Sequence, residues 1–267
     1  MTAKQPTYFL PHGAGPCFFV DWEPPDAWDK LASFLRGLPQ QLPKKPRALV
    51  VVSAHWETPS FTVQQTAQPE LIFDYSGFPS QTYALRYPAA GDPALATHIQ
   101  MLLQQVGLPT VADAVRGYDH GVFIPLLVAF PAADIPVLQL SLQANLDPAQ
   151  HFQAGQALAA LRADNILLLG SGMSYHNMRT FLSPCRPDAV AGTEFADWLT
   201  ATLTAEPAQR QAGLNDWAQA PGGRAAHPRA EHLLPLMVMA GAAEQDSGAE
   251  VFRDTVIGAV ITAYRFG

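Results

Sequence analysis

The alternation of short apolar runs with longer amphipathic segments constrains the fold of this chain most. Runs rich in β-branched or aliphatic residues occupy positions 7–10, 48–53, 135–142 and 165–170. Helix-length segments with apolar residues three and four apart occupy positions 93–106, 148–162, 188–203 and 231–242. Strands alternating with helices predict an α/β fold, in which a central, mostly parallel or mixed sheet is flanked by helices.

The size and composition of the chain are those of one globular domain. Of its 267 residues, 48% are hydrophobic and 15% are charged, so the chain can bury a large core and lacks the charge of a disordered protein. Its 24 prolines are scattered, which is typical of turns and not of a linker. We therefore expect residues 1–267 to form a single domain.

Charge and hydropathy argue against several classes of partner. The formal net charge is -7 and no run of Lys or Arg is present, so nucleic-acid binding is not expected. The longest apolar segment, 122–130, contains Pro125 and is shorter than the ~20 residues of a membrane span, so we expect it to lie in the core. Cys17 and Cys185 are too few for a disulfide framework, and no signal-peptide stretch opens the sequence. These features predict a cytoplasmic protein.

Three other stretches lack a strand or helix period. Residues 61–87 are predicted to supply additional antiparallel strands or a lid, and residues 38–47 to form a loop. Residues 218–228 contain Gly222 and Gly223 just before a segment that carries histidines. We expect this last stretch to be an active-site loop.

Five of the eight histidines occupy similar positions, at or just after a predicted strand or where a helix begins. They are His12, His55, His120, His176 and His232. In open α/β sheets the carboxyl ends of the strands and the adjoining loops bind ligands, so residues that are distant in sequence converge there. Because neutral imidazole is the commonest metal ligand, this pattern favours a metal site.

The remaining three histidines have simpler interpretations. His98 lies inside a predicted amphipathic helix and His151 in the first turn of another, so both are expected to be solvated or capping side chains. His227 either orients the loop before His232 or precedes Pro228 in an extended turn.

Seven short motifs follow one another along nearly the whole chain. In order they read PHG, SAHW, GFP, YDHG, PVLQLSL, GSG followed by HN, and HPRAEHLLPL. This ordered set resembles the DOPA 4,5-dioxygenase family, a branch of the class III extradiol ring-cleavage dioxygenases. The resemblance implies that residues 1–267 form one extradiol dioxygenase-like catalytic domain. The implied enzyme inserts both atoms of O₂ into a catechol-type, DOPA-like aromatic diol and releases a semialdehyde.

The resemblance also assigns roles to the histidines. It implies that His12, His55 and His232 bind one divalent metal ion, that His176 is the acid/base residue and that His120 faces the substrate ring. His176 is in addition a candidate fourth ligand of the resting metal. Fe(II) is the expected working ion, whereas three histidines with an open position also suit Zn(II) in the purified protein. The implied partners are the diol and O₂, and self-association into a homo-oligomer is open.

Two local features qualify these assignments. Glu231 is adjacent to His232, and neighbouring residues on a helix point about 100° apart, so only one of them is expected to face the metal. The resemblance favours His232. The family commonly has a small residue and then proline after the first His-Gly, whereas this chain reads HGAGP with one extra small residue. The residues at 83, 86 and 87 are expected either near the substrate or on a strand face.

Two alternatives stay open at this point. A zinc-dependent hydrolase could use the same three histidines to hold a metal-bound water whose pKa is lowered toward ~7. A non-catalytic binding protein is the other alternative, because related proteins called Memo have this fold and resemble interaction modules. Retention of all five histidines argues against the second alternative.

Overall fold

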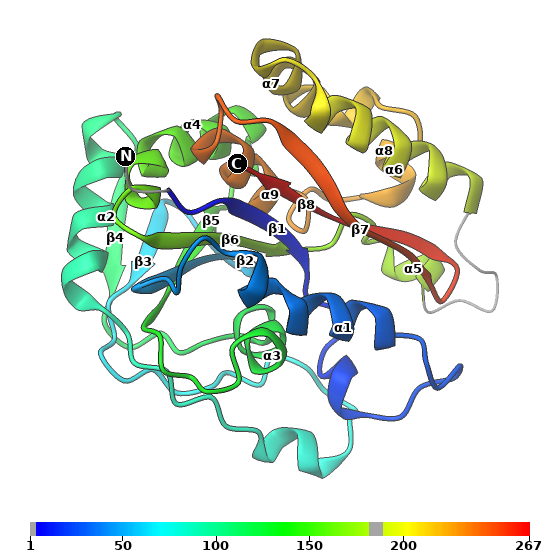
Figure 1. Ribbon diagram of the computed structural model, residues 1–267, viewed down its shortest axis with the longest axis horizontal. Coiled ribbons are helices and arrows are strands. Elements are labelled where there is room, and N and C mark those ends of the chain that lie inside the picture. The colour runs from blue at the N-terminus through cyan, green and yellow to red at the C-terminus, as the bar shows by residue number, and fades with distance from the viewer. Residues whose placement is uncertain (1–3, 182–188) are drawn as a thin grey trace.

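A mixed eight-stranded sheet runs through the middle of the computed structural model, which describes residues 4–181 and 189–267 (Figure 1). Its spatial order is β4-β3-β5-β2-β6-β1-β8-β7. The strands are β1 (Thr7–Pro11), β2 (Ala48–Thr58), β3 (Phe61–Gln64), β4 (Thr110–Asp113), β5 (Val137–Gln143), β6 (Ile166–Gly172), β7 (Gly248–Val256) and β8 (Ala259–Phe266). The predicted α/β class with a mixed sheet is confirmed.

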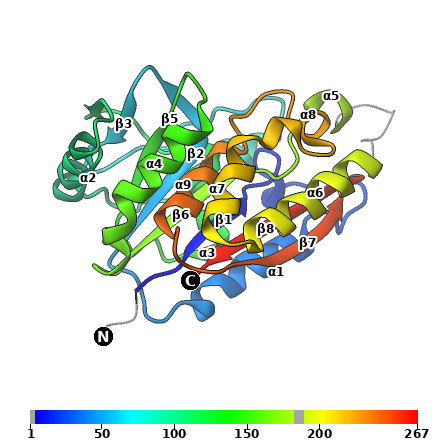
Figure 2. The same cartoon turned by 90° about the horizontal axis from the view of Figure 1, so that it is seen from above.

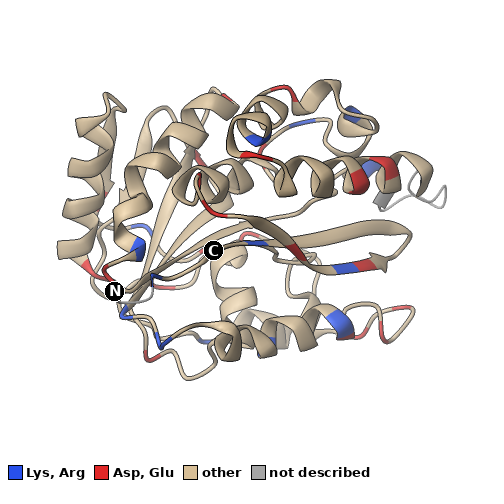
Figure 3. Ribbon diagram, turned by 45° about the horizontal axis from the view of Figure 1, so that its top comes forward, with Lys and Arg blue, Asp and Glu red and all other residues tan. Residues whose placement is uncertain are grey.

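The four predicted strands are the central ones, β1, β2, β5 and β6. They pair in parallel, β5 with β2, β2 with β6 and β6 with β1. Apart from Glu57 their sequences carry no charge, as expected for strands covered on both faces, and Figure 3 shows the charged residues mainly elsewhere. The pairing of β2 with β5 shifts register between Val52 and Glu57, which bends β2 around His55.

The outer strands were only partly predicted. β3 lies in the 61–87 stretch and pairs antiparallel with β5 through Val63 and Leu140, as expected, but it also pairs in parallel with β4. The rest of that stretch contains an isolated bridge from Leu71 to Tyr118 and a 3-10 turn over Ser80–Ala84. The antiparallel pair of β7 and β8 extends the sheet beyond β1.

Helices cover both faces of the sheet (Figures 1 and 2). They are α1 (Asp29–Gly37), α2 (Pro93–Gln105), α3 (His120–Ala129), α4 (Pro148–Leu158), α5 (Met178–Phe181), α6 (Ala189–Thr204), α7 (Pro207–Asn215), α8 (Gly223–Ala226) and α9 (Leu234–Ala242). In Figure 2 the helices α4, α7 and α6 lie on the face of the sheet that is turned toward the viewer. On the same face α9 contacts β1, β2 and β6. α3 contacts β2 and β6 from the opposite face and packs against α1.

The predicted helices are found as α2, α4, α6 and α9, with one error. Pro93 and Pro148 occupy the first turns of α2 and α4, as proline can at a helix start. Residue 188, the predicted start of α6, lies outside the described residues. Glu231 and His232 are not helical, because α9 begins only at Leu234. The prediction that Glu231 and His232 point about 100° apart on one helix was therefore wrong.

α3 and α9 are the two helices buried nearly all round. Every residue of α9 is buried, and so is every residue of α3 except Leu127, as expected for helices that are apolar on all faces. The apolar segment 122–130 is thus core, as predicted. Among the described residues, no helix combines the length and the apolar character needed to cross a membrane.

Candidate active site

The five histidines meet at the carboxyl ends of the central parallel strands. His12 directly follows β1, and its backbone N–H donates to the carbonyl of Gly172 at the end of β6 (3.1 Å). His55 lies in the irregular part of β2, and His120 is the first residue of α3. The convergence predicted from strand ends is therefore present in the structure.

The other two histidines come from segments that are tied to each other. His176 follows β6, and its N–H donates to the carbonyl of Ala226 in the 218–228 segment (2.9 Å). His232 lies in the turn before α9, and its carbonyl accepts from Met173 N–H (3.0 Å). A methyl group at Gly172 would lie 2.1 Å from that carbonyl, so only glycine allows β6 and this turn to approach so closely.

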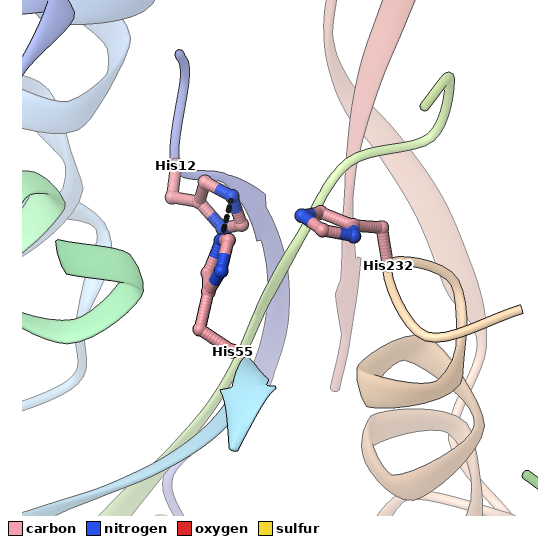
Figure 4. Close-up of side chains that lie close together, drawn as sticks. All are labelled: His12, His55 and His232. Atoms are coloured by element: carbon pink, nitrogen blue, oxygen red, sulfur yellow. Dashed lines mark hydrogen bonds between the residues drawn. The ribbon is translucent and has the colours of Figure 1, made fainter. Parts of the chain in front are cut away.

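His12, His55 and His232 present ring nitrogens to one shared point (Figure 4). One nitrogen from each lies within 4.8 Å of the others. The Nε2 atoms of His12 and His55 are 3.1 Å apart, and the ring centroids of His12 and His232 are 5.2 Å apart. Three imidazole nitrogens in such an arrangement are the donor set of a transition metal ion.

In His12 and His232, a hydrogen bond at the far side of the ring decides which nitrogen is free. The Ser171 hydroxyl donates to the carbonyl of Gly121, so toward His12 it can only accept. The Nδ1 of His12 must therefore carry the proton that it donates to Ser171 Oγ (3.1 Å), which leaves a bare lone pair on Nε2. The Nδ1–H of His232 likewise donates to Glu231 Oε1 (3.0 Å).

The position of Ser171 has a cause in the helix that it touches. The Gly121 carbonyl in α3 would normally accept the N–H of the residue four positions later, but that residue is Pro125, which has none. The Ser171 hydroxyl supplies the missing donor. One side chain thus satisfies a broken helical bond and fixes the tautomer of His12.

Burial keeps these imidazoles neutral. It lowers the pKa of His12 and of His55 well below the usual range, and the neighbouring histidines lower both further. Burial also lowers the pKa of His232 to about 4, against the opposing effect of Glu231. Two neutral rings with facing lone pairs repel unless a proton or a cation lies between them, so the residues fit a bound metal ion.

Glu231 lies behind His232 and not at the shared point. Its Oε1 accepts from His232 Nδ1 and lies 3.3 Å from His176 Nδ1, while Arg229 Nη1 lies 3.4 Å from its Oε2. Burial alone would raise the pKa of Glu231, but the hydrogen bonds from His176 and His232 hold it well below its usual range. The carboxylate therefore anchors two rings, and those of His176 and His232 stack with centroids 3.3 Å apart.

His120 is anchored in the same way by Asp74. The Asp74 carboxylate accepts both the backbone N–H of His120 (3.0 Å) and its Nδ1–H (2.7 Å). Burial alone would raise the pKa of Asp74, but these bonds hold it below its usual range. Two further groups, His55 with Asp74 and His120, and His176 with Glu231 and His232, also bring three donors within 4.8 Å. In both, a carboxylate already accepts from imidazole Nδ1.

A buried carboxylate beneath the site escaped the sequence analysis. Asp119 is fully buried and accepts from Ser53 Oγ (2.7 Å) and Arg116 Nη2 (2.9 Å). Ser53 Oγ in turn accepts the backbone N–H of His55 (3.2 Å). Burial raises the pKa of Asp119. The available signal was its position directly before His120.

A cavity of about 350 Å³ opens beside the histidines, large enough for a one-ring substrate. All five histidines line it. The rest of its wall is mostly aromatic or apolar and includes Trp22, Trp28, Tyr75, Phe78, Met173 and Met178. A second hollow of about 480 Å³ shares Trp22 and Phe78 with this cavity. The sequence analysis assigned none of these residues to the wall of a cavity.

Other predicted residues lie away from the cavity. Tyr83 lies in a 3-10 turn, and Arg86 and Tyr87 line a different hollow, so they are neither substrate neighbours nor a strand face. His98 is half-buried in α2. His151 is fully buried, so the expectation of a solvated side chain was wrong, although its Nδ1–H does bond the Asp147 carbonyl of its own first turn (2.7 Å).

The 218–228 segment lies against the site, as predicted. Its Ala225 carbonyl accepts from Asn177 Nδ2 (2.8 Å), beside His176. His227 is fully buried and bonds the Ser174 carbonyl through Nε2 (2.9 Å), with its ring against Phe195. Of the two interpretations of His227, the one in which it holds the loop agrees with these contacts.

Comparison with known proteins gives a consistent result. Residues 6–267 match the family described as the catalytic LigB subunit of aromatic ring-opening dioxygenase. A Beta vulgaris protein named 4,5-DOPA dioxygenase extradiol is 38% identical over 267 residues, covering 97% of this chain and 96% of that protein. An Escherichia coli (strain K12) protein of the same name is 36% identical, covering 90% and 86%.

Two further matches span the chain. Dioxygenase tasH of Hapsidospora irregularis is 36% identical over 282 residues, covering 98% of this chain and 85% of that protein. The crystal structure of an uncharacterized protein from Escherichia coli K12 matches with a TM-score of 0.79 and 31% identity, covering 99% and 100%. These matches confirm the family resemblance seen in the motifs. The chain belongs to the LigB family of aromatic ring-opening dioxygenases.

Proposed function

We propose that this enzyme cleaves catechol-type rings next to the diol, with one divalent metal ion held by His12, His55 and His232. The observation that carries this proposal is the convergence of their ring nitrogens, two of them with Nδ1 committed elsewhere, beside a largely apolar cavity. Fe(II) is the proposed working ion, and Zn(II) suits the same donors. A ferrous ion would supply the redox chemistry that lets O₂ react with a ring diol, which no side chain here can supply.

In this proposal His176 carries protons. The diol loses a proton when it binds, and ring opening requires a proton in return, so one group must act as base and then as acid. His176 lines the cavity, and its Nδ1 faces Glu231 Oε1 (3.3 Å). Its backbone bond to Ala226 and its stacking on His232 hold the ring in place. His176 serves as a fourth metal ligand only in a resting form without substrate.

His120 positions the ring of the substrate. Its Nδ1–H donates to Asp74, so in the neutral ring Nε2 is an acceptor, which suits a substrate hydroxyl as donor. His120 is 6% exposed and lines the cavity, with its ring 5.8 Å from that of Tyr75. The reaction consumes one diol and one O₂, and both oxygen atoms enter the semialdehyde product.

Reconstitution tests the proposal. The protein is loaded with ferrous iron under anaerobic conditions, and a panel of catechols is then followed for oxygen uptake and for a visible absorbance change. We expect one O₂ consumed per ring opened. Turnover that proceeds equally well without oxygen would instead support a zinc hydrolase. Absence of any reaction would support the binding-protein alternative.

Metal analysis tests the ligand set. A His12→Ala, His55→Ala double variant should lose the one equivalent of metal that the wild type retains after gel filtration. His98→Ala is the matched control, because this half-buried histidine lies in α2, outside the site, and its loss should leave the metal content unchanged. One equivalent of metal in the double variant would remove these two residues from the ligand set.

A further inference from the structure

The wall of the cavity determines which ring substituents fit, and several relatives of this chain are named for the amino acid DOPA. Among the described residues that line it, none is Lys, Arg, Asp or Glu. The other side chains that line it are mostly large and apolar or aromatic. Met178 is 42% exposed, and Trp22 and Phe78 also line the adjoining hollow. A substituent on the ring therefore meets hydrocarbon and aromatic surface.

The neutral polar groups of the wall are mostly engaged. The Tyr75 hydroxyl donates to the Thr82 carbonyl (2.8 Å), and the Tyr175 hydroxyl bonds Thr180 Oγ1 (2.9 Å). Asn177 donates through Nδ2 to Ala225. Little is left to solvate a charged group that enters the cavity, and burying an unpaired charge is costly.

Among the described residues, the charges around the cavity are mainly acidic, although Arg229 Nη1 lies 3.4 Å from Glu231 Oε2. Asp74 and Glu231 lie directly behind the histidine rings, and Asp21 lines the adjoining hollow. The nearest basic residue in sequence, Arg179, follows Met178 but is exposed and does not line the cavity. An anionic substituent would thus be desolvated without a Lys or Arg on the described wall to pair with it.

The adjoining hollow gives an apolar substituent room to extend. Phe18, Phe19, Trp22 and Phe78 line it, and the last two also form the cavity wall. Asp21 and Gln81 also line the hollow but are exposed, so a chain attached to the ring can run along the aromatic surface without meeting a buried polar group. Each methylene buried there adds apolar contact area.

We propose that this cavity selects catechols with an uncharged, apolar ring substituent and discriminates against those that carry a carboxylate. The inference rests on the proposed ring-cleaving function and narrows its substrate class. It identifies Trp22, Phe78 and Met178 as the specificity-determining residues.

A pair of matched substrates tests the inference. On iron-loaded enzyme, kcat/KM is measured by oxygen uptake for 3-(3,4-dihydroxyphenyl)propanoate and for its methyl ester, which differ in charge but little in shape. We expect the ester to be favoured by about tenfold or more, which corresponds to about 1.4 kcal/mol. In a series of 4-alkylcatechols, each added methylene should raise kcat/KM by up to about fourfold.

The outcomes separate this inference from the proposed function. If no catechol consumes oxygen, the proposed function itself fails. If the acid is cleaved as well as the ester or better, the function stands and the inference is overturned.

A charge-insertion variant gives an independent readout. Met178→Arg places a cation at the opening and should narrow the ester-to-acid ratio by about tenfold. Met101→Arg is the control, since Met101 is similarly exposed (48% against 42%) but lies on α2, away from the cavity. An unchanged ratio in Met178→Arg, or an equal change in both variants, would refute electrostatic selection.

Discussion

Replacing Ser171 by alanine is the sharpest test of how the site is held together. The hydroxyl is 2% exposed, accepts from His12 Nδ1–H and donates to the Gly121 carbonyl that Pro125 leaves without a helical donor. Its removal leaves two buried polar groups unpaired. It also frees His12 to move its ring proton to Nε2, where it would block metal binding.

The size of both effects follows from these contacts. An unpaired buried polar group costs about 1–3 kcal/mol, so with two such groups the free energy of unfolding of the metal-free protein should fall by about 2–6 kcal/mol. Groups that orient a metal-binding histidine typically contribute 10- to 100-fold in affinity, so the metal affinity should fall by about that factor. Loss of stability alone would not change the affinity of the folded protein.

The two effects are measured separately. Urea unfolding in the presence of a chelator gives the stability, and competition with a chelating dye gives the Zn²⁺ affinity. Ser141→Ala is the matched control. This hydroxyl is also fully buried, but its partners are Thr58 Oγ1 (2.7 Å) and Thr62 N–H (2.8 Å) and not a histidine. It should lose stability but keep its affinity. The reasoning is refuted if Ser171→Ala binds metal like wild type, or if both variants lose affinity equally.

Three further predictions concern other residues. Glu231→Gln should retain one equivalent of metal with weaker affinity, since the amide can still accept from His232, and metal analysis would show this. His176→Ala should lower kcat at least about a hundredfold with iron bound, whereas His120→Ala should mainly raise KM, as steady-state oxygen uptake would reveal. The free energy of unfolding should fall less between pH 7 and pH 4 in His151→Gln than in the wild type, as urea unfolding with chelator present would measure.

The sign of the last prediction follows from burial, which lowers the pKa of His151 to about 4. The unfolded chain takes up this proton near pH 6.5, whereas the folded protein takes it up only near pH 4. The stability from this group is complete above pH 6.5 and is lost as pH falls to about 4, by up to about 3 kcal/mol. Equal pH dependence in wild type and variant would contradict the assignment. Loss of the metal in Glu231→Gln would contradict the position of this carboxylate behind His232. A near-normal kcat in His176→Ala would contradict its role in proton transfer.

The positions of the five histidines were predictable because they depend on local pattern. Parallel strands such as β1, β2 and β6 end at the same edge of a sheet, so residues at their ends must lie near one another. The mistaken helical placement of Glu231 and His232 arose because the apolar period continues through the turn. Pro235, in the first turn of α9, was the signal that the helix starts later.

Ser171 and Asp74, which orient His12 and His120, were not predictable, because each depends on a tertiary contact. Ser171 matters only because β6 meets α3 opposite Pro125, and nothing in the sequence joins those two segments. Asp74 reaches His120 across 46 residues from a stretch without regular structure. The apolar wall is drawn largely from the 13–28 and 75–78 segments, whose sequences carry no helix or strand period, and its two methionines come from just after the end of β6 and from α5.

The extra small residue after His12 affects the wall of the cavity and leaves the position of His12 unchanged. His12 is fixed by β1 and by its bond to Gly172, upstream of the change. Gly13 and Gly15 both have positive φ (87° and 52°), and a methyl at Gly15 would lie 2.9 Å from the Phe78 ring. The loop therefore turns tightly and packs against Phe78. A departure from the family pattern at this point changes the surface that a ring substituent meets, so this loop is where selectivity among catechols can vary while His12, His55 and His232 stay in place.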